Sequence, residues 1–243
     1  MEQEQFEWIP FFEAIADGLL RYKGDRPALL QEFYEIANSE DYRKTEAVYT
    51  DKYKDGSTGR LKDIDPFTVI ALLMRTGGKK RNFAAMRLAR FLQVDMANPR
   101  FYAGAPMIRP EESLFFAYEE ERKDGDIDLH WDLLEKAINF ADSENNENDE
   151  ENKNAFVTAF DQSLTVKPIG RKYLTMGLFW VRADFFPVLS TPVCNYIKRK
   201  WNVSVDREIN GEEYLKIRDN LMLETYRSFP AISHAAYLKK AIR

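Results

Sequence analysis

The segment from Ile169 to Arg182 constrains the fold of this chain more than any other. It opens on a Pro-Ile-Gly turn at residues 168–170. Its apolar residues fall at helical spacing and also fill most of the remaining circumference: Leu174, Leu178 and Val181, with Tyr173, Met176, Phe179 and Trp180. A helix that is apolar on nearly all sides has to be buried, because a surface helix carries a polar stripe. The segment therefore predicts a central core helix.

The first turn of this predicted helix is basic. Arg171 and Lys172 follow Gly170 directly. Unpaired backbone N–H groups and the positive end of the helix dipole add to their charge there, which suits a phosphate or another anion. A core helix whose first turn is simply solvated shows the same pattern, and residue physics alone favours that simpler interpretation.

Amphipathic patterns elsewhere predict a mainly α-helical fold with a few short strands. Asp65 followed by Pro66 is the sharpest helix start, since aspartate caps well and proline suits the first helical position. Asp55 to Gly59 indicates a turn within a long loop. Helices are expected over 6–22, from Pro27 onward, from Pro66, and over 79–94, 128–141, 155–164, 192–201, 211–226 and 229–242. Short extended pieces are expected at 47–49, 185–189 and 201–209.

A polar, acidic run without any apolar residue covers 142–154. It indicates a linker or a helix lead-in. The expected organisation is an N-terminal helical lobe over 1–141 and a C-terminal helical lobe over 155–243, or one compact domain. The run does not fit a calcium-binding loop, because that loop needs a central glycine and none is present.

Bulk composition excludes several classes of protein. The 243 residues are 44% hydrophobic and 31% charged, and no stretch approaches the roughly 20 apolar residues of a membrane span. The polar, acidic N-terminus does not fit a secretory signal. A single cysteine, Cys194, rules out an internal disulfide and favours the cytoplasm. Two histidines, His130 and His234, are too few for a histidine metal cluster, so no metal site and no cofactor is predicted.

The strongest positive patch lies on the helix predicted over 79–94. The residues expected to face the core are Phe83, Met86, Ala89 and Leu92, and those expected on the opposite, basic face are Lys79, Lys80, Arg81, Arg87 and Arg90. This face is interpreted either as solvated or as anion-binding. The net charge of −5 argues against a non-specific nucleic-acid coat but not against a local basic patch.

Motifs for catalysis do not stand out. The sequence contains no phosphate-binding loop, no dinucleotide fingerprint and no Gly-x-Ser-x-Gly elbow. Cys194 lies in an apolar run and is interpreted as a buried structural thiol. His130 is interpreted as a helix-surface residue. No catalytic residue is therefore predicted.

Several segments, taken in order, resemble a known family. They are Ile64-Asp65-Pro66-Phe67-Thr68, Phe101 to Pro106 leading to Leu114-Phe115-Phe116-Ala117-Tyr118, Leu174 to Trp180, and Gly211 to Leu215. Together they resemble the N-terminal region of bacterial McrB-like AAA+ GTPases from modification-dependent restriction systems. Two departures stand out. Pro168-Ile169-Gly170 replaces a Gly-Val/Ile-Gly turn, and Leu189 to Cys194 lacks the acid and arginines of Leu-Asp-Ser-Arg-Asn-Arg.

The resemblance implies a DNA-recognition module of an antiphage restriction system, without the NTPase motor. Its partners would be DNA, as a modified or unmodified duplex, and an AAA+ motor domain or partner subunit. The residues predicted to contact DNA are Arg75, Lys79, Lys80, Arg81, Arg87, Arg90, Lys167, Arg171 and Lys172. One alternative is a protein-interaction module of a defence system. Another is a base-excising enzyme that would need a carboxylate near the Gly170 turn, with Asp161 and Asp184 as the candidates.

Overall fold

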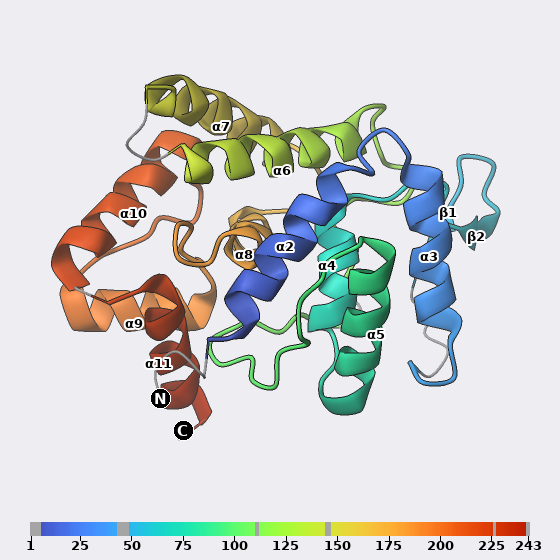
Figure 1. Cartoon of the computed structure of the whole chain (residues 1–243). Coiled ribbons are helices and arrows are strands. Elements are labelled where there is room, and N and C mark those ends of the chain that lie inside the picture. Colours follow the sequence, from blue (N-terminus) through green and yellow to red (C-terminus); the bar gives the residue numbers. More distant parts are fainter. Residues whose placement is uncertain (1–5, 43–48, 110–111, 144–146, 226, 242–243) are drawn as a thin grey trace.

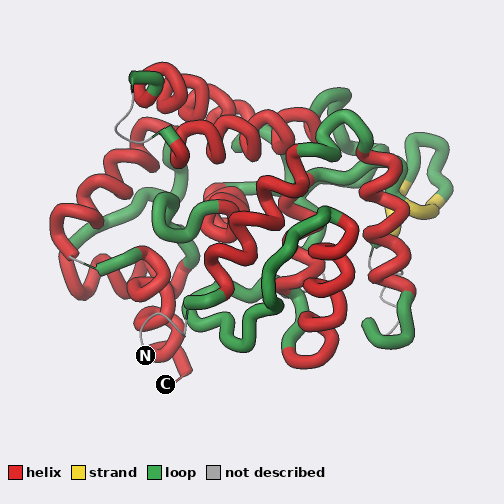
Figure 2. The backbone as a smooth tube through the Cα atoms, in the orientation of Figure 1, coloured by secondary structure: helices red, strands yellow, loops and turns green. Residues whose placement is uncertain are grey.

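The computed structural model describes residues 6–42, 49–109, 112–143, 147–225 and 227–241. Figure 1 shows helices arranged around a central one, and Figure 2 shows how little of the tube is strand. The helices are α2 (Trp8–Leu20), α3 (Arg26–Asn38), α4 (Pro66–Met74), α5 (Gly78–Phe91), α6 (Asp126–Asp142), α7 (Asp149–Ser163), α8 (Arg171–Val181), α9 (Thr191–Trp201), α10 (Gly211–Thr225) and α11 (Phe229–Ala241). The mainly α-helical prediction is confirmed.

Helix α8 is the buried helix that its sequence predicts. Every residue from Leu174 to Val181 is buried, and α2, α4 and α6 pack against the helix. Figure 1 shows α8 nearly end-on among them. The Trp180 indole N–H still donates a hydrogen bond to the Pro106 carbonyl at 3.2 Å. Burial of this segment therefore organises the surrounding helices.

Helix α4 begins at the predicted cap. The Asp65 carboxylate accepts hydrogen bonds from the backbone N–H groups of Phe67 at 2.9 Å and Thr68 at 3.1 Å. These bonds satisfy two of the donors that a helix start leaves unpaired. All residues of α4 are buried, and the helix ends at Met74 before the Gly77-Gly78 pair. Gly78 opens α5 with a φ of +57°, a left-handed conformation that favours glycine.

The acidic run contributes to two helices. Helix α6 extends to Asp142, and α7 begins at Asp149 and packs alongside α6 (Figure 1). The start of α6 also differs from expectation. Gly125, in a left-handed conformation at φ 89°, occupies the cap position, and α6 begins at Asp126, two residues before the start predicted at residue 128. One hydrophobic core includes residues from both sides of the run, from Trp8 to Ala236. The division into lobes 1–141 and 155–243 stays a prediction.

Strand structure in the described residues is limited to one hairpin. Strands β1 (Thr50–Lys52) and β2 (Thr58–Arg60) pair antiparallel, with Thr50 opposite Arg60. Residues 53–57 connect them, with Gly56 at φ 84°, so the turn predicted at 55–59 overlaps this connection but its last two residues belong to β2. The expected strand at 47–49 falls mostly outside the described residues. Within the described residues, no helix has the length and apolar character needed to cross a bilayer.

Candidate nucleic-acid interface

The first turn of α5 gathers positive charge without a side-chain cap. Gly77 occupies the cap position, its backbone is extended, and no acidic residue lies in the first turn. Lys79 is exposed and Lys80 is half-buried. Because glycine offers no capping side chain, the N–H groups of this turn stay available beside the two ammonium groups. This end of α5 therefore has the chemistry of an anion site.

Arg81 does not lie on the predicted basic face. It is only 7% exposed, and its guanidinium donates to the carbonyls of Leu73 at 3.1 Å and Thr76 at 2.6 and 2.9 Å. It also lies over the ring of Tyr102, 4.3 Å from the centroid. The buried stripe of α5 runs through Arg81, Ala84, Ala85, Leu88 and Ala89. Arg81 sits on this stripe, so it stabilises the end of α4 rather than facing solvent.

Met86 lies outside this buried stripe, so its predicted inward position is wrong. Its side chain is 57% exposed, because the buried face lies about one residue away from the expected one. Exposed positions on α5 recur instead at spacings of three and four, which place them on one side of a helix. They are Lys79, Asn82, Met86 and Arg90. We call these four residues the outer stripe of α5.

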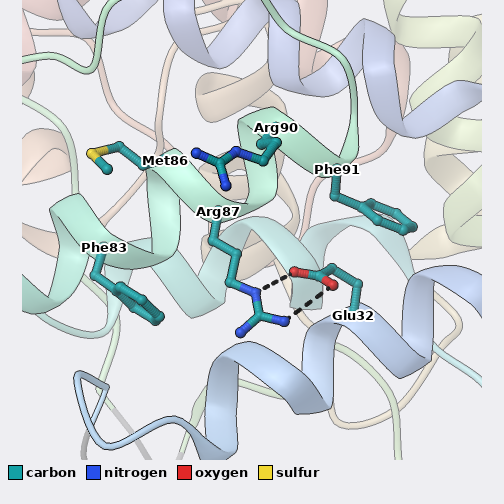
Figure 3. A pocket seen from close by; sticks show the side chains of 6 residues that line it. All are labelled: Glu32, Phe83, Met86, Arg87, Arg90 and Phe91. Atoms are coloured by element: carbon teal, nitrogen blue, oxygen red, sulfur yellow. Dashed lines mark hydrogen bonds and ion pairs between the residues drawn. The ribbon is translucent and has the colours of Figure 1, made fainter.

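A groove of about 530 Å³ separates α5 from α3 beside this stripe. Figure 3 shows Arg87 reaching across it to Glu32 of α3, with Phe83 and Phe91 on either side. The Arg87 Nε lies 2.7 Å from Glu32 Oε1, and Nη2 lies 3.5 Å from Glu35 Oε2. The hydrogen bond to Glu32 raises the pKa of the Arg87 guanidinium. Arg87 is thus neutralised within the fold, whereas Arg90 forms no ion pair with any described carboxylate.

Arg75 is held against an aromatic ring. It lies at the C-terminal end of α4, and its guanidinium carbon is 5.0 Å from the centroid of the Tyr49 ring. Its Nη1 atom is buried. This placement leaves Arg75 half-buried between α4 and the segment before β1.

The three cations predicted at the start of α8 differ in their surroundings. Arg171 donates through Nη1 to the carbonyl of Asp206, so one nitrogen of its guanidinium is engaged by backbone. The Lys172 Nζ lies 3.9 Å from Glu112 and 4.4 Å from the centroid of the Tyr173 ring. Lys167 is exposed and makes no ion pair within the described residues. It borders a separate hollow of about 490 Å³ formed with Lys52 and residues 112–121.

The carboxylates considered for base excision lie in other settings. The Asp161 carboxylate accepts a hydrogen bond from the Gly211 N–H at 2.7 Å and so caps α10. Asp184 follows the C-terminal end of α8, the end opposite Gly170. Burial raises the pKa of the Asp184 carboxyl. The residues that the structure describes contain no group of three or more potential metal ligands.

His130 is fully buried, so its predicted surface position is wrong. Its Nδ1 lies 3.6 Å from Asp65 Oδ1, and its ring packs edge-on against Phe67 at 5.7 Å. The reason is that α6 packs on α4 through this face.

Cys194 is partly buried, and burial raises the pKa of its thiol.

Sequence reasoning missed two parts of these sites. Glu32 and Glu35, at helical spacing on α3, were a local signal for an acidic face opposite the basic helix. Lys52 was not predicted, and no signal in the sequence joins it to the predicted Lys167, because only folding brings the two segments to one hollow.

Comparison with known proteins places the chain in a family. No curated protein and no solved structure matches it significantly. A family model described as a domain of unknown function (DUF8425) matches residues 8–239, from the first residue of α2 into α11. The chain belongs to this family.

Proposed function

We propose that this protein is the DNA-recognition module of a McrB-like restriction or antiphage system, and that it contacts DNA through the outer stripe of α5. The observation that carries the proposal is the state of the α5 cations. Arg81 and Arg87 are used inside the fold, whereas Lys79, Lys80 and Arg90 have no ion pair with any described carboxylate. Free cations beside an uncapped helix start are suited to phosphates.

The dimensions of α5 fit a nucleic-acid backbone. Lys79 and Arg90 are eleven positions apart and lie on the same side of the helix, roughly 16 Å from each other along its axis. That distance corresponds to roughly five base pairs of B-DNA. Asn82 and Met86 lie between them on the outer stripe, and an asparagine amide can pair with an adenine edge in the major groove. The resemblance of the sequence to the McrB-like N-terminal region points the same way, with a cytoplasmic motor domain or subunit as the second partner.

The test is fluorescence anisotropy with short duplexes containing cytosine, methylcytosine or hydroxymethylcytosine at several salt concentrations. The proposal expects salt-dependent binding that prefers one of these duplexes. Replacing Lys79, Lys80 and Arg90 by alanine should weaken binding. It should also reduce the slope of log K against log salt by about 0.9 for each phosphate that is no longer neutralised.

The matched control removes three exposed cations from the last turn of α9, namely Lys198, Arg199 and Lys200. It changes the net charge by the same amount, so a DNA-binding surface on α5 predicts a much smaller effect. Equal losses in both triple variants, or no binding of any duplex at low salt, would refute the proposed interface.

A protein-interaction module is the second candidate, and exposed apolar side chains favour it. Leu223 on α10 is 76% exposed, and Met222 and Leu238 are also exposed. Contiguous exposed apolar patches mark contacts with other proteins, and these side chains are the ones that such a patch would include. The affinity of a partner protein bound there should depend little on salt. Leu223→Ala should weaken binding of that partner and leave DNA binding unchanged.

A further inference from the structure

The hollow beside Lys167 is a second candidate site, separate from the α5 surface. It encloses about 490 Å³ between β1, residues 112–121 and the turn that precedes α8. This volume lies within the range of small-molecule pockets in proteins. Much of its wall is carbon, from the side chains of Leu114, Phe116, Tyr118, Ile169 and Tyr173. An aromatic and aliphatic wall of this kind favours a flat ring system as the ligand.

Two lysines from distant parts of the sequence line the same hollow. Lys52 belongs to β1, and its Nζ lies 4.9 Å from the centroid of the Tyr118 ring and 4.0 Å from a Glu120 oxygen. Lys167 is exposed, and no carboxylate of the described residues pairs with it. An ammonium group supplies only donors, so the ligand portion near the lysines has to supply acceptors or negative charge. A phosphate meets both requirements.

Two carboxylates complete the lining. Glu112 lies 3.9 Å from the Lys172 Nζ, a separation longer than a hydrogen bond, so its oxygens keep capacity to accept from a ligand. Glu121 is exposed and also lines the hollow. Ionised carboxylates only accept hydrogen bonds, so a ligand at this position must bring N–H or O–H donors.

We propose that the hollow binds one nucleoside monophosphate unit whose base carries an exocyclic amino group, as cytosine, adenine and guanine do and thymine does not. The base stacks on the aromatic wall, its amino group donates to Glu112 or Glu121, and its phosphate lies against Lys52 and Lys167. The unit is either a free nucleotide or a nucleotide turned out of a strand. The second form rests on the proposed DNA binding, and the first does not.

The experiment titrates the full chain with dCMP, dAMP and dTMP by calorimetry, with deoxycytidine as the ligand that lacks phosphate. Binding of dCMP or dAMP in clear preference to dTMP is expected, because thymine has no exocyclic amino group. Lys167→Ala should weaken dCMP binding about tenfold, the scale of one charge-assisted hydrogen bond, and leave deoxycytidine unaffected. Tyr118→Ala should weaken the binding of dCMP and of deoxycytidine by a similar factor, because the base then has less aromatic surface to stack on.

Lys54→Ala is the matched control, since Lys54 is an exposed lysine of the same hairpin and does not line the hollow. It should leave dCMP binding unchanged. Equal affinity for dTMP and dCMP overturns the assignment of the amino group. No binding of dCMP or dAMP at millimolar concentration, or the same loss in Lys54→Ala as in Lys167→Ala, overturns the site.

The two sources of the ligand, and the two proposals, separate in the same set of variants. If Lys167→Ala weakens binding of a duplex with one mispaired cytosine as well as dCMP, the unit is read within a strand. If only dCMP is affected, the ligand is the free nucleotide. The variant lacking Lys79, Lys80 and Arg90 should bind dCMP normally. Nucleotide binding without any duplex binding would therefore end the DNA-recognition proposal and leave the hollow in place.

Discussion

Replacing Gly177 by alanine tests the packing of the central helix α8 on α4. A Cβ atom at this position would lie 2.6 Å from Cδ1 and 2.9 Å from Cγ of Phe67. The Phe67 ring is fully buried and packs against Phe115 at 5.9 Å and His130 at 5.7 Å. It therefore has little room to move away. Relief of the overlap requires the two helices to separate or the ring to leave its position.

Two opposing energies decide the outcome. Alanine is favoured over glycine inside a helix by about 1 kcal/mol. Overpacking of a well-packed core costs about 1–3 kcal/mol. Because two ring carbons of a fully buried side chain are involved, we expect the upper part of that range. Gly177→Ala should therefore lower the free energy of unfolding by about 2 kcal/mol, despite its better helix propensity.

Urea unfolding of four proteins measures this effect: the wild type, Gly177→Ala, Phe67→Leu and the double variant. Leucine at residue 67 removes the ring, so the double variant should be more stable than the sum of the single effects by about 1–2 kcal/mol. Gly24→Ala is the control, since nothing lies within 4 Å of a Cβ at Gly24. A Gly177→Ala variant as stable as the wild type, or strictly additive effects in the cycle, would refute the packing argument.

Three further predictions concern polar groups inside the fold. Asp65→Ala should cost about 3 kcal/mol in urea unfolding, because two amides and the Thr68 hydroxyl lose their acceptor in a buried setting, and Asp65→Asn should cost less. Arg81→Ala should also cost about 3 kcal/mol while duplex affinity, measured where the variant is fully folded, stays unchanged. Burial raises the pKa of the Glu13 carboxyl above 4.5 in the folded protein, so the wild type loses stability as pH rises through that pKa. In paired unfolding experiments, the free energy of unfolding of Glu13→Gln relative to that of the wild type should then be higher at about pH 7 than at about pH 4.

Each of these has a contrary result that would count against it. Equal losses for the alanine and asparagine variants of Asp65 would show that its capping oxygens matter little. Loss of duplex binding in folded Arg81→Ala would place that side chain at the DNA after all. A difference between Glu13→Gln and the wild type that does not change with pH would contradict the raised pKa. The pH effect at Glu13 arises mainly from burial, with Asp184, Asp17 and Asp142 adding to it and Arg182 opposing it.

Local signals in the sequence determined much of the fold. The Asp65-Pro66 start of α4 and the buried helix α8 occur where the residues predict them, and the hairpin turn at 53–57 overlaps the predicted one. The physical reason is that a cap, a turn and an apolar circumference depend on residues within a few positions of one another. The clustering of basic residues on α5 is visible in the same way.

Tertiary structure alone decided which of those residues are available to a ligand. Arg81 is turned inward by the carbonyls at the end of α4, and Arg87 is paired with Glu32, far from it in sequence. His130 is buried because α6 packs on α4, and the second hollow exists only because the segments that carry Lys52 and Lys167 fold so as to line the same space. Burial and ion pairing depend on which helices pack together, and a periodic pattern in one segment carries no information about the partner that will cover it.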